Sequence, residues 1–358
     1  MQKNPSELRR AFDEDGVHKT HIGGQALIEG VMMRGKTHWA VAVRTDDGSI
    51  YQEEHALKAK GRTSWMKLPL VRGCVAFVDS LLLGFKALEV SASHAALFDD
   101  DQDDRDAASQ TSQSNQVDQA QQPDHADTNK TNQVDQAAAD DEGLSRGEIA
   151  ISFVIGIVLA LALFMLAPAA LSNLVVGDYD VNPFAWNMVD GISRVAIFIF
   201  YVWLIGRMKD IKRMFAYHGA EHKTIHCYEH GLELTPENAR RFPRLHVRCG
   251  TAFMIMVMII ALLLYTIIPL DQLIGFLGVK ESLPKFLLVL VVRIALLPAI
   301  AGISYEITVK WAGSHPDNPL VKVLLWPGMQ MQRLTTNEPD DSQLECAIAA
   351  MKQVLAHE

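Results

Sequence analysis

The stretch that begins at Tyr217, YHGAEHKTIHCYEHG, combines residue types that bind metals and activate water. His218, Glu221 and His222 form the pattern H-x-x-E-H. In inverzincin proteases that pattern places two histidines on the metal and the glutamate beside the bound water. Residues four apart share one face of a helix, so the two histidines can bind the same ion. This stretch therefore predicts a divalent-metal site, with Zn²⁺ as the expected ion and Glu221 as general base.

A second fragment, HVRCGT, supplies two more ligand types. His246 and Cys249 lie three residues apart, and their nitrogen and sulfur atoms suit a borderline-soft ion such as Zn²⁺. Glu306, in the fragment ISYE, is a further candidate base or ligand. The expected ligand set is His218, His222, His246 and Cys249.

The alternative interpretation of the histidine stretch is a solvated, partly cationic helix face beside a bilayer. His226, His230 and Cys227 fit that interpretation better than a metal site, because one ion cannot reach all four histidines of the series. Gly231 is a natural C-terminal cap and predicts that the helix ends after His230.

The composition separates apolar segments from one acidic segment. Hydrophobic residues make up 49% of the 358 residues, yet the net charge is −9. Between Asp99 and Glu142 there are thirteen acidic residues against two basic ones, which leaves the rest of the chain near neutrality. The acidity thus gives no indication of a nucleic-acid partner, and we expect none. Four scattered cysteines are too few for a disulfide framework.

Four apolar runs are long enough to cross a bilayer core of about 30 Å. We expect transmembrane helices at residues 149–173, 184–206, 251–270 and 286–305. The intervening segment 207–250 carries nine Lys and Arg residues, whereas the other two connections carry few or none. The positive-inside rule places that segment in the cytoplasm, and both termini with it. We therefore predict a multi-pass membrane protein, with the lipid bilayer as its partner.

Charged residues interrupt the second and fourth runs. Asp190 and Arg194 are one helical turn apart in the second run, and Arg293 enters the fourth run from the same side. A lone charge inside a membrane is expensive, so we expect these three residues to form an ion-pair cluster. That cluster either locks the helices together or lines a transport pathway, and locking is the favoured interpretation.

The remaining segments divide into a tail, a folded region, a tether and a C-terminal part. After the tail 1–20, residues 21–98 predict a cytosolic α+β region with two strands in HWAVAVRTDDGSIYQEEHAL and an amphipathic helix near the membrane. Residues 99–145, rich in Gln and Asp, predict a disordered tether before the membrane domain 146–310. Within the cytosolic segment 311–358 we expect an amphipathic helix at 342–357.

A glycine-rich fragment, GGQALIEGVMMRG, lies near the start of the α+β region. It has neither a Walker lysine nor the G-x-G-x-x-G spacing, so nucleotide binding is poorly supported. Two interpretations stay open. The fragment is a loop entering a strand, or it brings Glu29 and Arg34 to face the metal site.

The fragments GGQALIEGVMMRG, YHGAEHK, HVRCGT, ISYE and QRLTTNEP together resemble the YqhQ family of bacterial membrane proteins. The resemblance runs from about Gly23 to the C-terminal helix and excludes the acidic tether. It implies a multi-pass membrane protein with a metal site, described for the family as a predicted metal-dependent enzyme. Val247 stands where the family has proline, which is expected to alter the turn before Cys249 but not the ligand types.

These observations predict a mainly α membrane protein with about four transmembrane helices, a cytosolic N-terminal α+β region and a C-terminal amphipathic helix. The function that we expect is metal-dependent hydrolysis of a membrane-associated peptide or lipid-like substrate at the cytoplasmic face. Two alternatives belong to other classes. One is a transporter that uses the charged cluster in its spans, and the other is a non-catalytic scaffold with a structural metal site.

Overall fold

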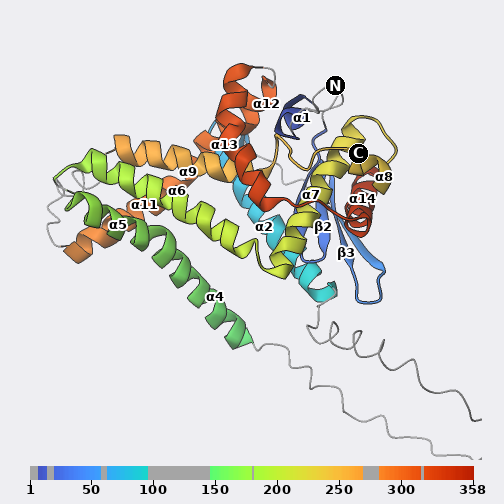
Figure 1. The fold of residues 1–358 in the computed structure, drawn as a ribbon, viewed down its shortest axis with the longest axis horizontal. Helices are drawn as coiled ribbons and strands as arrows, with labels where there is room; N and C mark the ends of the chain where they lie inside the picture. The colour runs from blue at the N-terminus through green and yellow to red at the C-terminus, as the bar shows by residue number, and fades with distance from the viewer. Residues whose placement is uncertain are drawn as a thin grey trace, which may run out of the picture. The chain divides into compact units, whose positions relative to one another are not determined.

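The computed structural model describes residues 7–13, 20–57, 63–95, 146–179, 181–268, 282–315 and 318–358 (Figure 1). The segment expected to be a disordered tether, 99–145, lies outside the described residues. The chain divides into two units, one made of residues 1–96 and 162–358 and the other of residues 97–161. In the second unit, the described part is helix α4 (Arg146–Leu161).

The N-terminal region of the first unit is a four-stranded antiparallel sheet in the order β1-β2-β3-β4. The strands are β1 (Gly23–Leu27), β2 (Gly30–Arg34), β3 (His38–Arg44) and β4 (Ile50–Ala56). Strands β3 and β4 are the two that the sequence predicts, joined through Asp46-Asp47-Gly48 with Gly48 at positive φ. The glycine-rich fragment forms the additional hairpin β1–β2. Position 30 is a glycine because the strand lies so close to β3 that a Cβ there would meet the Ala42 carbonyl oxygen at 2.3 Å.

Helices cover both faces of this sheet. Alternate β2 and β3 residues, such as Val31 and Ala42, pack on helices α7 (Lys209–Glu229) and α14 (Asp341–Leu355). The opposite face, including Val41, packs on Leu83 of helix α2 (Val71–His94). Because successive side chains of a strand point to opposite faces of the sheet, the strands contribute to two separate apolar cores, one on each face. Helix α7, which carries the histidine stretch, packs against both the sheet and α14.

Within the described residues, four helices are long and apolar enough to cross a membrane. They are Val154–Val176, Pro183–Ile205, Gly250–Ile267 and Val291–Trp311. These ranges correspond to the four expected spans, each displaced by a few residues. The first contains a π-turn, η2 (Ala162–Leu166), directly before α5 (Ala167–Val176), where Pro168 has no amide hydrogen to continue the α-helical ladder.

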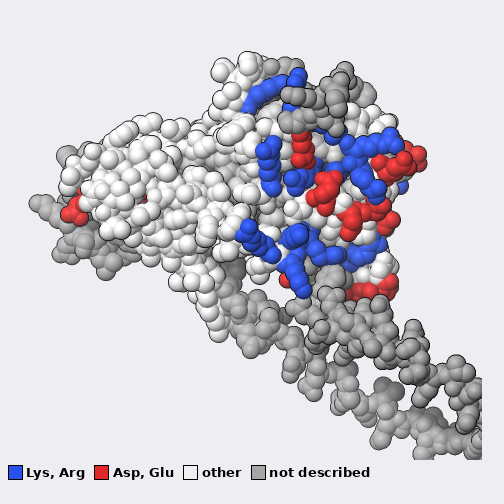
Figure 2. All heavy atoms as spheres, in the orientation of Figure 1, with Lys and Arg blue, Asp and Glu red and all other residues white. Residues whose placement is uncertain are grey.

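The helices α6 (Pro183–Ile205), α9 (Gly250–Ile267) and α11 (Ser282–Tyr305) pack side by side. The C-terminal end of α6 and the N-terminal end of α9 lie toward the sheet (Figure 1). At the end of α11, Tyr305 lies against α2, where a Cβ on Gly73 would be 2.7 Å from the Tyr305 Cβ. Large apolar side chains on these helices face outward, among them Phe200, Leu263 and Val291. Figure 2 shows the same division of the surface, with Lys, Arg, Asp and Glu gathered over the sheet and its covering helices.

The C-terminal part contains two longer helices. Helix α13 (Pro319–Thr335) packs on α9, where a Cβ on Gly328 would lie 2.6 Å from the Cα of Ala252, a contact too short to form without a shift. The sequence interpretation did not include this helix, which has Pro327 in its interior. The expected helix at 342–357 is present as α14, capped one residue before Asp341 by Asp340 in a capping box with Gln343.

Candidate metal centre

Three of the predicted ligands converge in the structure. Ligand atoms of His218, His222 and Cys249 all lie within 4.8 Å of one another. Both histidines project from α7 one turn apart, with ring centroids 4.5 Å apart. Cys249 precedes α9, so the sulfur atom lies at the N-terminal end of a candidate membrane span. Two nitrogens and one sulfur make a donor set that suits Zn²⁺.

Backbone carbonyls set the ring orientation of both histidines. His218 Nδ1 lies 2.8 Å from the carbonyl oxygen of Thr335, and His222 Nδ1 contacts the carbonyl oxygen of Arg244. A carbonyl only accepts, so each Nδ1 carries the hydrogen and each Nε2 keeps its lone pair. This arrangement is typical of metal-binding histidines, whose second nitrogen is held by an outer partner.

The Nε2 atom of His222 is buried and, among the described residues, has no hydrogen-bond partner. An unpaired buried polar atom costs about 1–3 kcal/mol, so its retention calls for an explanation. Burial lowers the pKa of His222 to about 4, which keeps its ring neutral. A neutral imidazole with a lone pair facing a cysteine sulfur is in the protonation state that a metal requires.

Cys249 is partly buried and acts as the N-terminal cap of α9. Its sulfur lies 3.2 Å from His218 Nε2, and it accepts from Thr251 N at 3.4 Å. Burial, the largest single influence, raises the pKa of the thiol, whereas hydrogen bonds from the hydroxyl and the backbone N–H of Thr251 lower it. The net pKa is lowered, which favours the thiolate.

Glu221 lies beside this group, buried against the β1 backbone. A Cβ on Gly24 would meet the Glu221 side chain at 2.8 Å, so the glycine leaves the space that the carboxylate occupies. Burial raises the pKa of Glu221 to about 7, while the neighbouring His218 acts in the opposite direction. A carboxyl group of this kind, next to a possible metal, has the features of a general base.

His246 lies outside the group of three. Its ring centroid is 5.5 Å from that of His222, and its Nδ1 accepts from Arg248 N at 3.3 Å. Its Nε2 faces the Glu229 carboxylate at 4.0 Å, and burial lowers its pKa to about 3. In this geometry His246 packs beside His222 without joining the three converging ligand atoms. Its role as a direct ligand stays a prediction.

The other expected supporting residues have different partners. Glu306 forms an ion pair with Arg72 of α2, and Glu29 forms one with Arg213 of α7. Glu29 has φ of 52° at the β1–β2 turn and also accepts from Tyr217 Oη at 3.2 Å. Arg34 ends β2 opposite Trp39. None of the three supplies an atom to the converging group that the described residues form.

The charged residues of the candidate spans do meet. Asp190 Oδ2 lies 2.8 Å from Arg194 and 3.7 Å from Arg293, joining α6 to α11. The Arg293 guanidinium also lies 5.0 Å from the centre of the Tyr265 ring on α9. Three helices are thus tied together by one carboxylate and two guanidinium groups.

Sequence reasoning missed several residues that position the centre. Gln332 of α13 makes paired hydrogen bonds with the backbone of His246, at 2.8 and 2.9 Å. Glu229, fully buried, binds Arg248 and the hydroxyl of Thr20. Gln332 and Thr335 both lie in the fragment QRLTTNEP, so that fragment was the available signal.

Comparison with known proteins agrees with the resemblance of these fragments. The profile of a family described as "Protein of unknown function (DUF1385)" matches residues 68–357. The "Uncharacterized protein YqhQ" of Bacillus subtilis (strain 168) is 31% identical over 335 residues, covering 93% of this chain and 92% of that protein. No solved structure matches the chain. The chain therefore belongs to the YqhQ family, the family of unknown function that this profile defines.

Proposed function

We propose that this chain binds a divalent metal, most favourably Zn²⁺, through His218, His222 and Cys249. The observation that carries the proposal is the convergence of three ligand atoms within 4.8 Å, with both histidine Nδ1 atoms held by backbone carbonyls. Three protein ligands are the number that catalytic zinc sites use, with the fourth position left for water or substrate.

The chemistry that we propose is hydrolysis, with Glu221 as general base. A bound zinc lowers the pKa of its water and polarises a carbonyl or phosphoryl oxygen. Burial raises the pKa of Glu221 to about 7, so its carboxyl group can take up and release a proton near neutral pH. This property suits it to take a proton from water.

We further propose that the protein is embedded in a bacterial inner membrane and acts at its cytoplasmic face. Four membrane-length helices and the nine basic residues between the second and third support this placement. Cys249 directly precedes α9, so the metal centre adjoins the N-terminal end of this candidate membrane span. A membrane-associated peptide or a lipid-like molecule is the class of substrate that reaches such a position.

A second candidate function, ion or solute transport, has one observation in its favour. Asp190 Oδ1, Arg194 Nε and Arg293 Nε are buried without hydrogen-bond partners among the described residues. Ionisable groups inside membrane spans commonly mark a pathway. The mutual ion pairs of these residues favour the locking role instead.

The test is Glu221→Gln in detergent-purified, zinc-loaded protein, assayed on fluorogenic peptides and on lipid-like esters. We expect turnover to fall by about 100-fold or more while the zinc content is unchanged. Glu237→Gln, whose side chain is 82% exposed on α8 (Pro236–Arg240), is the matched control and should retain full activity. Loss of zinc from Glu221→Gln would make Glu221 a ligand, and absence of turnover in the zinc-loaded wild type would leave the metal a structural role.

A further inference from the structure

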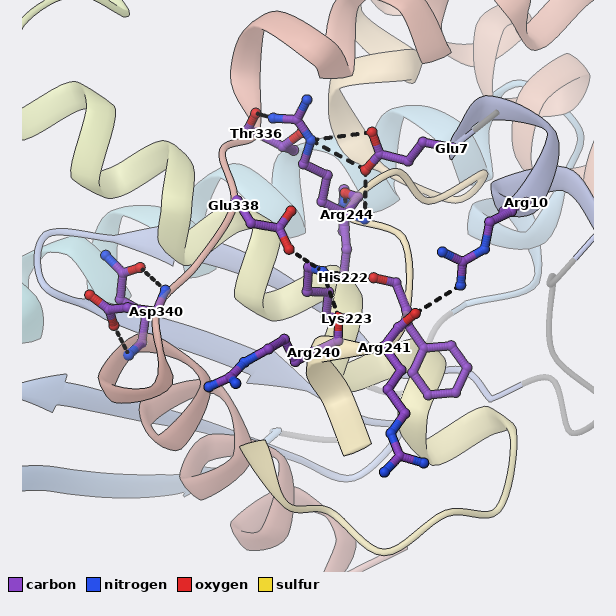
Figure 3. Close-up of polar contacts among 12 residues, drawn as sticks. Glu7, Arg10, His222, Lys223, Arg240, Arg241, Arg244, Thr336, Glu338 and Asp340 are labelled. Carbon is purple, nitrogen blue, oxygen red and sulfur yellow. Dashed lines mark hydrogen bonds and ion pairs between the residues drawn. The ribbon is translucent and has the colours of Figure 1, made fainter. Parts of the chain in front are cut away.

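A second polar site opens on the far side of the His222 helix turn. It is a pocket of about 430 Å³ at the junction of α1 (Glu7–Asp13), α7 and α8. Its lining carries five cationic side chains, namely Arg10, Lys223, Arg240, Arg241 and Arg244. Two carboxylates, Glu7 and Glu338, oppose them, so the lining keeps an excess of positive charge (Figure 3).

Lys223 is the most deeply buried of these cations. Its residue is 3% exposed, and its ammonium donates to the carbonyl oxygens of Arg240 at 3.0 Å and of Phe242 at 2.8 Å. The third contact is an ion pair with Glu338 at 2.6 Å. A buried ammonium needs a counter-charge, so this third position must hold an anion.

The anion that holds this position is poorly anchored. The Glu338 side chain is 64% exposed, whereas that of Lys223 is 4% exposed. Glu338 belongs to the segment between α13 and α14 and reaches the ammonium from solvent (Figure 3). A ligand anion of higher charge can take the place of this carboxylate without leaving Lys223 uncompensated.

Two neighbouring arginines are also held only by exposed carboxylates and can therefore contact a ligand. Arg240 pairs with Asp341 and Arg241 with Glu237, and all four side chains are more than half exposed. Such surface ion pairs contribute about 0–1 kcal/mol, so their partners exchange readily. The guanidinium groups can therefore turn toward a ligand in the pocket at little cost.

We propose that this pocket binds a small phosphate-bearing ligand, whose phosphate displaces Glu338 from Lys223. Arginine forks and a lysine ammonium are the groups that recognise phosphate oxygens. The volume suits a small molecule, and the two carboxylates at the edges oppose an extended polyanion. This inference is independent of the metal and of hydrolysis.

The test is calorimetric titration of the full-length protein in detergent with inorganic phosphate, at ionic strength held constant with chloride. We expect saturable binding that Arg241→Gln weakens by about three- to tenfold, because one charge-assisted contact is lost. Glu338→Gln removes the competing carboxylate and should tighten phosphate binding by about threefold or more. Lys352→Gln, an exposed change on α14, is the control and should bind as the wild type does.

A weaker affinity in Glu338→Gln, or equal affinity in all variants, would overturn the displacement mechanism. Absence of phosphate binding to the wild type would overturn the proposal itself. Repeating the titration in phosphatidylcholine nanodiscs with and without phosphatidylglycerol identifies the source of the phosphate. Competition by phosphatidylglycerol supports a lipid headgroup as the natural ligand, and unchanged affinity supports a soluble phosphate compound.

Discussion

Two polar clusters in this chain differ in the kinds of groups that they bring together. In the cluster Asp190, Arg194 and Arg293, one carboxylate forms ion pairs with two guanidinium groups, one on its own helix and one on α11. In the cluster His218, His222 and Cys249, the converging atoms are all lone-pair donors. The first cluster holds groups of both charges, whereas the second lacks a positive partner.

This difference separates a structural role from a binding role. Removing a member of an ion-paired cluster leaves a buried charge, so the effect falls on stability. Removing a member of a lone-pair cluster takes away a ligand, so the effect falls on metal binding. Unfolding free energy and metal content, measured on the same variants, distinguish the two roles.

The largest effect on stability is expected from Asp190→Leu. It leaves Arg194 and Arg293 without their shared carboxylate, and the free energy of unfolding should fall by about 3–5 kcal/mol. Denaturant unfolding in detergent measures this change. Arg293→Leu should cost less, because Asp190 keeps its 2.8 Å contact with Arg194.

The matched control is Ile192→Ala, whose side chain is exposed on the same helix. Metal content should be normal in all three variants. A metal-free but stable Asp190→Leu protein would show that the two clusters are not separate.

Removing the metal is expected to have a smaller effect on stability. At free zinc of 100 times the dissociation constant, binding adds about 2.7 kcal/mol to the free energy of unfolding. A chelator should therefore lower the melting temperature of the wild type in a scanning fluorimetry experiment. The same chelator should not shift Cys249→Ala, and an equal shift in both proteins would place the metal elsewhere.

The smallest effect is expected from Gly219→Ala. A Cβ at this position would lie 2.1 Å from the carbonyl oxygen of Asn337, so the segment that follows α13 must move. Thr335, whose carbonyl holds His218, is the last residue of α13 and directly precedes that segment. We expect a loss of about 1–3 kcal/mol in unfolding free energy, together with weaker zinc binding measured by competition with a chromophoric chelator.

Gly250→Ala is the matched control for this change. Gly250 adjoins Cys249, yet a Cβ there meets nothing within 4 Å among the described residues. Normal zinc affinity in Gly219→Ala would mean that the carbonyl of Thr335 does not set the orientation of His218.

The sequence predicted the ligands that share one helix better than the supports that hold them. Spacing alone placed His218 and His222 on one face, and α7 confirms it. The supports are backbone carbonyls of Thr335 and Arg244, and any residue type can supply a carbonyl. The fragment QRLTTNEP could mark its segment as part of the site, but the identity of its side chains does not show that the carbonyl of Thr335 holds His218.

The fold was predictable where local period decided it. The four apolar helices and the β3–β4 hairpin follow from run length and alternation. The β1–β2 hairpin was harder to predict, since its glycines serve close contacts made by distant residues such as Ala42 and Glu221. Helix α13 was missed, and Pro327 in its interior interrupts the pattern that identifies a helix.

The central claim is tested most directly by measuring metal content by mass spectrometry on detergent-purified, chelator-free protein. We predict about one zinc per chain in the wild type, in Cys74→Ser and in His230→Ala, whose altered residues lie outside the converging group. We predict none in Cys249→Ala and none in His218→Ala. Wild-type protein that stays metal-free after incubation with zinc, or Cys249→Ala that keeps a full equivalent, would contradict the account.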